Sequence, residues 1–312
     1  MSGGHLVIVN PASGSGRTRG RWAALAGELA TMGVDAQVAL TSGPSDATRL
    51  TRDFVRAGGR EVIVFGGDGT IGETVAGFVD ERGEGMLAED ITLGIVHQGT
   101  GGDMVRGLGI PRGARAALQT ICSGTTREID LGIARYRSRF GDGEEVRAFA
   151  TNANVGMGAD VVEQVTGRLK KFGSSAAFAI ASVNAILKVQ PKRMIFEGER
   201  SGRRELDVLE VMIGNNRYMG GGMMATPDAL VDDGELDVVA VTAAGKMKLV
   251  STFPKIYKGA HLGEAIVTTM REPSFTIDMP DDPQGVVLDG ELVGRTPVHF
   301  RVLHRAFRVR VP

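Results

Sequence analysis

Three glycine-rich segments in the first third of the chain have the composition of phosphate-binding loops. They run from Asn10 to Arg17, from Gly66 to Glu73 and from Gln98 to Asp103, and each directly follows a short apolar run. Small residues allow backbone N–H groups to converge on an anion, and a following helix N-terminus adds partial positive charge. Any one segment could be an ordinary turn. Three at one edge of a predicted sheet favour nucleotide binding.

The second segment places an acidic side chain, Asp68, among its glycines. Gly67 to Gly72 formally satisfies the dinucleotide pattern G-x-G-x-x-G, which keeps a dehydrogenase among the alternatives. That pattern expects an acidic residue at the end of the next strand, whereas this strand ends at His97. A carboxylate would repel a bare pyrophosphate, so the segment favours a nucleotide bound with a cation such as Mg²⁺.

Charge and lysine usage exclude several classes of protein. No lysine occurs before Lys170, so neither a P-loop nor the strand lysine of a protein kinase can be built in the glycine-rich half. The formal net charge is −1, which argues against a broad nucleic-acid surface. No nucleic-acid partner is expected.

A later acidic motif allows two interpretations. Asp289 and Glu291 flank Gly290 between two apolar runs. Asp-Gly in this setting is a strong hairpin signal. A carboxylate there could also accept a proton from an alcohol that attacks a phosphate, and both interpretations can hold together.

A second acidic cluster surrounds Gly234. Asp232, Asp233 and Glu235 offer the closely spaced oxygens that Mg²⁺ prefers, without the spacing of an EF-hand. A solvated turn is the alternative.

The pattern of the first 125 residues predicts a fold that can position these glycine-rich segments. Apolar runs alternate there with amphipathic stretches, which indicates a parallel sheet covered by helices on both faces. Ligands of such sheets bind beyond the carboxyl ends of the strands, where the glycines lie. The predicted strands are 6–9, 34–40, 61–65 and 91–96, and the predicted helices are 18–32, 45–57 and 70–79.

After about residue 125 the pattern changes to alternating segments separated by glycine-rich turns, which predicts mostly antiparallel β structure. One helical insertion is expected at 161–187. We therefore predict two domains, 1–125 and 126–312, with the last residues able to pack back on the first domain. The predicted strands of the second half are 127–136, 145–155, 193–197, 205–213, 235–241, 274–278, 285–288 and 298–311.

The composition is that of an ordinary globular protein, with 312 residues, 42% hydrophobic and 23% charged. The single cysteine, Cys122, and the lack of a leader pattern predict a reducing, cytoplasmic setting. The longest apolar stretch, 174–187, is too short to span a bilayer. Any membrane contact is expected to be transient and at the surface.

Four motifs together resemble the diacylglycerol kinase catalytic-domain family, which includes bacterial lipid kinases and sphingosine kinases. They are Asn10-Pro11 with its Gly/Ser tail, Gly66 to Thr70, Gly99-Thr100 through Asp103 with Arg106, and Leu288 to Glu291. The resemblance implies a Rossmann-like α/β nucleotide domain, as in NAD kinases, a β-rich domain for the lipid, and an active site between them.

The same resemblance implies roles for individual residues. Asp68 and Asp103 would organise Mg²⁺ on the phosphates, Asp289 would be the general base with Glu291 beside it, and a structural Mg²⁺ would lie at Asp232, Asp233 and Glu235. The residues expected to approach ATP are Asn10, Ser13, Gly66, Gly67, Asp68, Gly69, Thr70, Glu73, Thr100 and Asp103.

Two positions depart from the family pattern. Gly72 and Gly102 each stand where the family usually has asparagine, so two amide side chains are missing from the nucleotide site. On the lipid side, basic residues 168–171 lead into the apolar stretch 174–187, which is compatible with a helix near anionic headgroups or with a core helix. The methionines of 219–224 could line a lipid chain or fill core gaps.

The expected function is that of an ATP- and Mg²⁺-dependent lipid kinase acting on a hydroxyl of a diacylglycerol-like or other lipid alcohol. An NAD kinase-like enzyme shares the GGDG segment and is one alternative. A nucleotide- or lipid-binding protein that has lost catalysis is another, because of Gly72 and Gly102. A homodimer is compatible with the sequence.

Overall fold

The computed structural model describes residues 4–14, 16–159, 161–162, 184–186 and 188–312. The predicted helical insertion at 161–187, with the basic residues at 168–171 and most of the apolar stretch 174–187, lies almost entirely outside the described residues. Among the described residues, no helix is long and apolar enough to cross a membrane.

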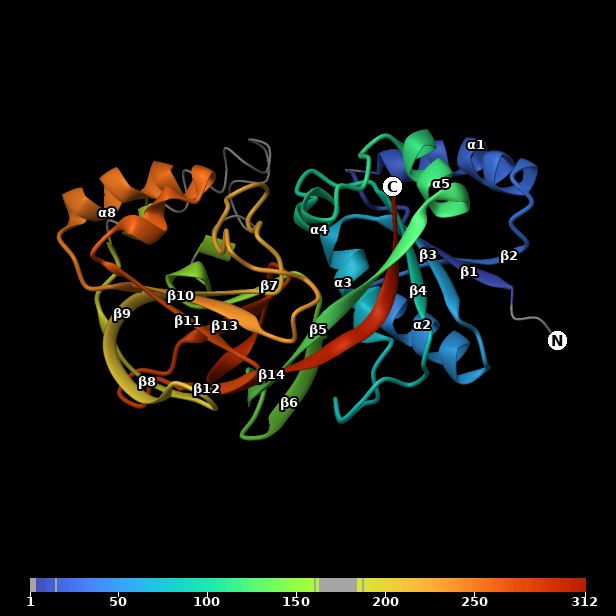
Figure 1. The fold of residues 1–312 in the computed structure, drawn as a ribbon. Coiled ribbons are helices and arrows are strands. Elements are labelled where there is room, and N and C mark those ends of the chain that lie inside the picture. The colour runs from blue at the N-terminus through green and yellow to red at the C-terminus, as the bar shows by residue number, and fades with distance from the viewer. Residues whose placement is uncertain (1–3, 15, 160, 163–183, 187) are drawn as a thin grey trace.

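The first domain contains the predicted parallel strands. Strands β2, β1, β3 and β4 lie side by side in that order, and each neighbouring pair is parallel (Figure 1). Their carboxyl ends therefore meet at one edge of the sheet, which brings the glycine-rich segments together. The bounds are β1 His5–Val9, α1 Arg17–Thr31, β2 Ala36–Leu40, α2 Asp46–Arg56, β3 Glu61–Gly66, α3 Asp68–Ala76, β4 Thr92–His97, α4 Asp103–Gly107 and α5 Ala114–Ser123.

Helices cover both faces of these strands, as the continuous apolar runs require. Leu6 and Ile8 of β1 pack in one core with α2 and α3, whereas Val7 and Val9 pack in another with α1 and α5. Strand side chains alternate between the two faces, so a strand buried on both must be apolar throughout.

The second half is antiparallel, as predicted, with a break inside one expected strand. The segment 145–155 forms two strands, because the amides at Ala150 and Thr151 leave the ladder and bind the carboxylate of Asp289. The bounds are β5 Thr125–Ser138, β6 Glu144–Phe149, β7 Asn152–Gly156, β8 Lys192–Gly198, β9 Gly202–Gly214, β10 Leu236–Thr242, β11 Val267–Glu272, β12 Ser274–Asp278, β13 Gly285–Leu288 and β14 Glu291–Val311.

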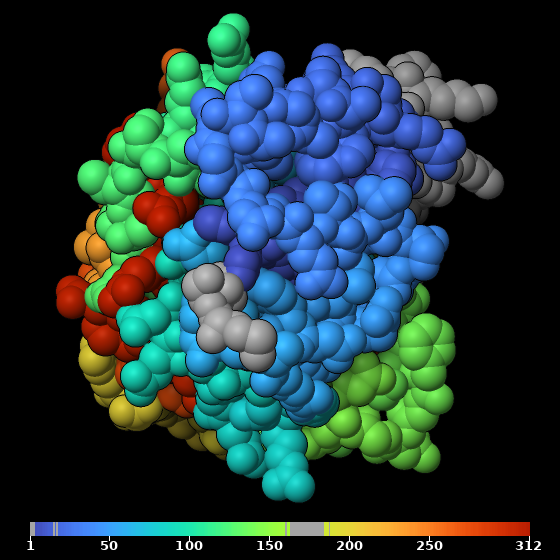
Figure 2. Space-filling view, turned by 90° about the vertical axis from the view of Figure 1, so that its right-hand side faces the viewer, coloured from blue at the N-terminus to red at the C-terminus, as the bar shows by residue number. Residues whose placement is uncertain are grey.

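Two long strands connect the halves. Strand β14 pairs with β5 along most of its length and then, at Arg308 and Val309, pairs in parallel with β4 of the first domain. Figure 2 looks at the first domain and shows the end of the chain, in red, at the surface beside α5, in green. The division near residue 125 stays a prediction, because the sheet is continuous across it.

Short helices cover one face of the second domain. They are α8 Lys246–Thr252, η2 Phe253–Lys258 and η3 Ala260–Gly263. Figure 1 shows them, in orange, as a layer over β9, β10 and β11. Phe253 and Ile256 pack toward the apolar residues of these strands, so the helices and the sheet face each other across apolar side chains.

Candidate active site

The three glycine-rich segments meet at the carboxyl edge of the parallel strands. Asn10 donates its side-chain N–H to the Thr70 hydroxyl at 2.9 Å, and the Gly67 N–H donates to Ser13 Oγ at 3.3 Å. A Cβ built on Gly99 would lie 3.1 Å from the Cα of Gly67, so the second and third segments touch through their backbones. Parallel topology thus assembles one loop cluster from segments that lie far apart in the sequence.

Asp68 lies inside this cluster. Its two oxygens accept the Gly102 N–H at 3.0 and 2.9 Å, and Oδ2 lies 3.3 Å from His97 Nε2. Burial alone would raise the pKa of Asp68, but His97 and the Gly102 amide outweigh it and hold the pKa below its ordinary value. Asp68 therefore stays ionised at neutral pH.

Asp103 begins helix α4 beside Asp68. It pairs with Arg106 at 2.8 Å and accepts the Gly221 N–H at 2.8 Å. Burial raises its pKa and the nearby charge of Asp68 adds to the rise, although the amides of Gly221 and Gly222 and the Arg106 charge oppose it. Two neighbouring carboxylates that repel each other are a favourable environment for a cation.

Asp68 and Asp103 therefore suit Mg²⁺ as two of its ligands, but they cannot complete its coordination by themselves. Two carboxylates offer the oxygen donors that Mg²⁺ prefers, and Mg²⁺ in kinase sites commonly takes its remaining ligands from phosphates and water. Within the described ranges, no group of three or more His, Cys, Asp or Glu residues has metal-binding geometry. A metal here would depend on the phosphates of the nucleotide.

Asp289 occupies the turn predicted from Asp-Gly. Leu288 pairs with Glu291, and both residues between them have positive φ, 47° for Asp289 and 83° for Gly290, as a type I′ turn requires. The Asp289 side chain is half-buried, and its carboxylate accepts the N–H groups of Ala150, Thr151 and Asn152 at 2.9 to 3.1 Å. Burial raises its pKa even though these amides lower it.

Glu291 is more accessible. Its side chain is 44% exposed, and it pairs with the guanidinium of Arg147 at 2.7 Å. Its Oε1 lies 3.3 Å from where a Cβ on Gly69 would be, which places the carboxylate beside the phosphate-binding segment. The partner Arg147 is largely buried; burial alone would lower its pKa, but Glu291 outweighs this and raises it.

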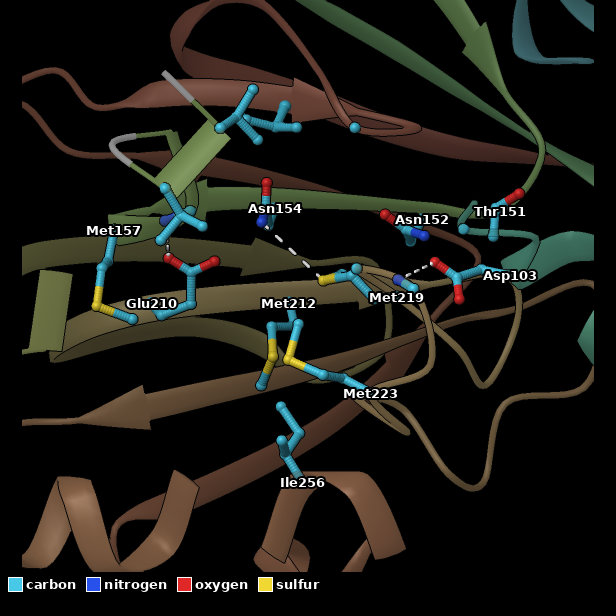
Figure 3. A pocket seen from close by; sticks show the side chains of 18 of the residues that line it. Asp103, Thr151, Asn152, Asn154, Met157, Glu210, Met212, Met219, Met223 and Ile256 are labelled. Carbon is cyan, nitrogen blue, oxygen red and sulfur yellow. Dashed lines mark hydrogen bonds between the residues drawn. The ribbon is translucent and has the colours of Figure 1, made fainter. Parts of the chain in front are cut away.

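A cavity of about 680 Å³ joins this cluster to the interior of the second domain. Figure 3 shows Asp103 at one side of it and Met157 and Glu210 at the other. One end is polar and is formed by the loop residues Gly67, Asp68, Gly69, Gly99, Thr100, Gly101, Asp103, Asp289, Gly290 and Glu291. The other end is mostly apolar and is lined by side chains that include Met157, Val161, Val162, Ile186, Leu209, Met212, Met219, Met223, Val241, Leu249, Phe253, Ile256 and Ile266.

Some predicted residues lie outside this cavity. Asn10, Ser13, Gly66 and Thr70 support the loop cluster without lining the cavity. A Cβ on Gly66 would lie 2.5 Å from that of Thr70, so glycine is needed there for the close approach. Glu73 accepts the N–H groups of Ser45 and Ala47 at the start of α2, so its role as a nucleotide contact stays a prediction.

The acidic cluster around Gly234 is rich in ion pairs. Asp232 pairs with Arg127 at 2.9 Å, Asp233 pairs with Arg271, and Glu235 pairs with Arg200. A cation would have to compete with these guanidinium groups. The proposed structural Mg²⁺ stays a prediction that the described geometry does not favour.

The two glycines that depart from the family pattern have structural reasons. A Cβ on Gly72 would lie 3.2 Å from Asp289 Oδ2, so glycine gives this carboxylate room. Gly102 has φ +77° and its N–H binds Asp68. A Cβ on Gly102 would also lie 2.9 Å from Arg112 Nη2, so glycine suits this position of positive φ.

Sequence reasoning missed several residues that complete the site. They are Arg147 of β6, the amides of 150–152 at the break between β6 and β7, and the cavity residues Asn154 of β7 and Glu210 of β9. The Gly158 N–H donates to Glu210 at 2.7 Å, which gives this buried acid a polar contact inside a largely apolar chamber. These polar residues lie in strands where polar and apolar residues alternate, and they belong to no sequence motif. No signal in the sequence therefore indicated them.

This geometry defines a class: an α/β domain whose loops suit phosphates, joined through one cavity to a β-rich domain that suits an apolar molecule. Residues 5–134 match the diacylglycerol kinase catalytic domain, and residues 151–311 match the YegS C-terminal NAD kinase beta sandwich-like domain. The chain therefore belongs to the diacylglycerol kinase catalytic-domain family, which confirms the resemblance noted from its motifs.

Individual relatives that match along most of the chain are named as diacylglycerol or lipid kinases. The chain is 28% identical over 309 residues to the diacylglycerol kinase of Mycobacterium tuberculosis, covering 98% of this chain and 94% of the other. It is 30% identical over 280 residues to a protein named as a YegS-like lipid kinase of Pseudomonas aeruginosa, covering 90% and 86%.

Solved structures share the fold. A diacylglycerol kinase of Bacillus anthracis superimposes with a TM-score of 0.78 at 23% identity, covering 99% of this chain and 97% of the other. Yeast NADH kinase gives a TM-score of 0.51 at 9% identity, covering 99% and 83%. The expected combination of an α/β domain with a C-terminal β domain is thus confirmed at the level of the fold.

Proposed function

We propose that this lipid kinase transfers the γ-phosphate of ATP to a hydroxyl of a diacylglycerol-like membrane lipid. In this proposal the Rossmann-like first domain binds the nucleotide, and the second domain holds the lipid chains. The protein would work in the cytoplasm and contact the membrane surface transiently.

The observation that carries the proposal is the single cavity with two unlike ends. Asp68, Thr100 and Asp103 line the end that suits a nucleotide, and side chains such as Met212 and Ile256 line the end that suits a hydrocarbon. A volume of about 680 Å³ is of the size that holds a drug-sized or lipid-like molecule. An enzyme for a soluble dinucleotide has no need of the apolar chamber.

Phosphoryl transfer to the lipid hydroxyl requires a carboxylate that accepts the hydroxyl proton. As the lipid hydroxyl oxygen bonds to the γ-phosphorus, the bond from that phosphorus to the β-bridging oxygen breaks, and ADP leaves. Glu291 suits the proton acceptor because it is partly exposed beside Gly69. Asp289, whose oxygens bind three amides, suits a positioning role that holds strand β7 beside the turn.

The remaining residues would bind and orient. Asp68 and Asp103 would hold Mg²⁺, which when bound neutralises charge on the phosphates. The Gly67 and Gly69 backbones leave room for phosphate oxygens, and Arg147 fixes the Glu291 carboxylate.

The test is transfer of labelled γ-phosphate, with Mg²⁺, to a mixed-micelle panel of diacylglycerol, monoacylglycerol, phosphatidylglycerol, sphingosine and ceramide, with NAD in a parallel reaction. We expect a labelled lipid, with diacylglycerol the first candidate. The Glu291→Gln protein is the matched control, because it keeps the shape of the side chain without its basicity.

Other outcomes point elsewhere. Labelled NADP would assign the protein to the NAD kinase-like alternative. ATP binding without any labelled product would favour a binding protein that has lost catalysis through Gly72 and Gly102.

A further inference from the structure

The segment from α8 to η2 carries apolar side chains on its inner and on its outer side. Leu249, Phe253 and Ile256 point inward and line the cavity. On the outer side, Met247 is 89% exposed, Tyr257 is 39% exposed and Val250 is 38% exposed. Large apolar side chains at such exposure along one short segment are unfavourable in water unless something covers them.

The same segment is basic. Four of the eight lysines of the chain, Lys246, Lys248, Lys255 and Lys258, lie within 13 residues. No aspartate or glutamate occurs between Asp237 and Glu264. Lys248 and Lys255 pair with Glu264, whereas Lys246 and Lys258 form no ion pair with any residue that the structure describes.

Other exposed apolar residues lack this combination. Val38 and Leu40 lie on the edge strand β2 of the first domain, and Phe140 lies alone in the turn between β5 and β6. Their neighbourhoods in the sequence contain no lysine. An exposed apolar row flanked by excess lysine charge is the pattern of a surface that rests on anionic lipid headgroups.

The segment lies between this outer surface and the cavity. The layer of α8, η2 and η3 is the outer wall of the apolar end of the cavity (Figures 1 and 3). A bilayer in contact with the outer side would lie one helix thickness from the chamber that would hold the lipid chains.

We propose that the outer face of α8 and η2, formed by Lys246, Met247, Val250, Tyr257 and Lys258, docks on an anionic bilayer surface. This docking rests on the proposed function, since it would bring the cavity to a substrate embedded in the membrane. Met247 and Tyr257 enter the interfacial region, and the lysines pair with anionic headgroups.

The test measures binding of the full chain, without ATP, to sedimented vesicles of phosphatidylcholine with and without 30 mol% phosphatidylglycerol. Two double variants are compared with wild type, Lys246→Glu with Lys258→Glu, and Met247→Ser with Tyr257→Ser. Matched controls on distant surfaces are Arg115→Glu on α5 and Phe140→Ser, whose side chain is 93% exposed. Thermal melts establish that every variant is folded.

We expect wild type to bind the vesicles that contain phosphatidylglycerol. The lysine variant should bind at least about 25-fold more weakly, at about fivefold for each basic residue near an anionic surface. The apolar variant should also bind more weakly, and both controls should bind as wild type does. Equal binding to neutral vesicles, unchanged binding of both double variants, equal loss in the controls, or no binding of wild type would each overturn the proposal.

A second readout separates this proposal from the proposed function. Phosphorylation of a short-chain diacylglycerol, dispersed without vesicles, should be the same in the double variants as in wild type. If wild type binds vesicles through this face but phosphorylates no lipid, the function fails and the docking stands. If lipid is phosphorylated while the double variants bind vesicles normally, the docking fails and the function stands.

Discussion

At the scale of single residues, the two acids of the Asp289 turn have different surroundings, and for this reason we propose different tasks for them. The half-buried Asp289 carboxylate accepts three backbone N–H groups, which hold it in a fixed position beside the cavity. Glu291 has an exposed side chain beside Gly69 and a guanidinium partner in Arg147. A motif that names both residues cannot separate them, because burial is a property of the fold.

Glu291→Gln should lower kcat for lipid phosphorylation by about 10²- to 10⁴-fold, the usual contribution of a general base. The melting temperature should change little, because the side chain is 44% exposed. Steady-state kinetics and a thermal melt measure the two effects. Activity within tenfold of wild type would remove Glu291 from the role of proton acceptor.

Asp289→Asn should lower the free energy of unfolding by about 1 to 3 kcal/mol, because an amide NH₂ would face N–H groups that now donate to a carboxylate. Activity should fall as a consequence of this local distortion. Urea denaturation provides the measurement. A variant as stable as wild type but inactive would instead support direct proton transfer by Asp289.

At the scale of elements, the junction between β3 and α3 depends on a position where only glycine fits. The carboxyl end of β3 and the first turn of α3 come together at Gly66 and Thr70, and Thr70 in turn holds Asn10. Glycines inside α1 have no such neighbour. The two kinds of glycine look alike in the sequence and differ only in what surrounds them.

Gly66→Ala should destabilise the protein by about 1 to 3 kcal/mol, because the new Cβ would lie 2.5 Å from that of Thr70. ATP affinity should fall as Thr70 is displaced. Gly20→Ala in α1 is the matched control: open space surrounds Gly20, so the change should be neutral or stabilise by up to about 1 kcal/mol. Equal effects of the two substitutions in thermal melts and ATP titrations would contradict this account.

The pairing of β10 with β11 predicts a pH dependence of stability. Asp237 lies opposite Arg271 in this pair, and burial raises its pKa to about 6, although the Arg271 charge opposes the rise. The folded state therefore binds this proton more tightly than the unfolded state, so the contribution of Asp237 to stability is lost as pH rises from about 4 to 6.

Asp237→Asn should therefore be more stable than wild type at pH 7, by about 1 to 3 kcal/mol, with little difference below pH 4. Denaturant melts between pH 4 and pH 7.5 would measure the difference. A constant difference at every pH would show that the charge of Asp237 is not the cause.

At the scale of the whole molecule, the site exists only because β5 and β14 run between the two halves. Strand β14 starts at Glu291 in the second domain and ends beside β4 of the first. This crossing places the Asp289 turn against Gly72 and Gly69 of α3. The result is a cavity whose polar end is built from loops of both domains and whose apolar end lies in the second domain.

The size of the apolar end should set the preferred chain length of the lipid. Met212→Trp places a larger side chain in the chamber and should lower kcat/KM for long-chain diacylglycerol about tenfold or more, with a smaller effect on a dioctanoyl substrate. The KM for ATP should not change. Met212→Leu, which nearly conserves volume, is the control and should keep the wild-type preference. An equal loss on both substrates would argue against chain binding at Met212.

The sequence by itself predicted the parallel strands and first three helices of the first domain, most strands of the second half, and the family, but not α4, α5, α8 or β11. Alternating apolar runs and amphipathic stretches predicted the parallel strands of the first domain within about two residues, because periodicity and glycine placement are local properties. The motifs at Asp68, Asp103 and Asp289 identified the diacylglycerol kinase catalytic-domain family. Asp289-Gly290 also predicted its hairpin correctly.

Only the tertiary structure decided what each motif touches. Residues far away in the chain determine the division of 145–155 into two strands and the amides that bind Asp289. They also supply Arg147 to Glu291 and the arginine partners of Asp232 and Asp233. The same holds for the cavity that joins the two ends of the site. Burial from solvent and ion pairing arise between segments that are distant in the sequence. The local sequence pattern therefore predicts strands and helices, whereas the packing of these elements decides the chemical environment of each side chain.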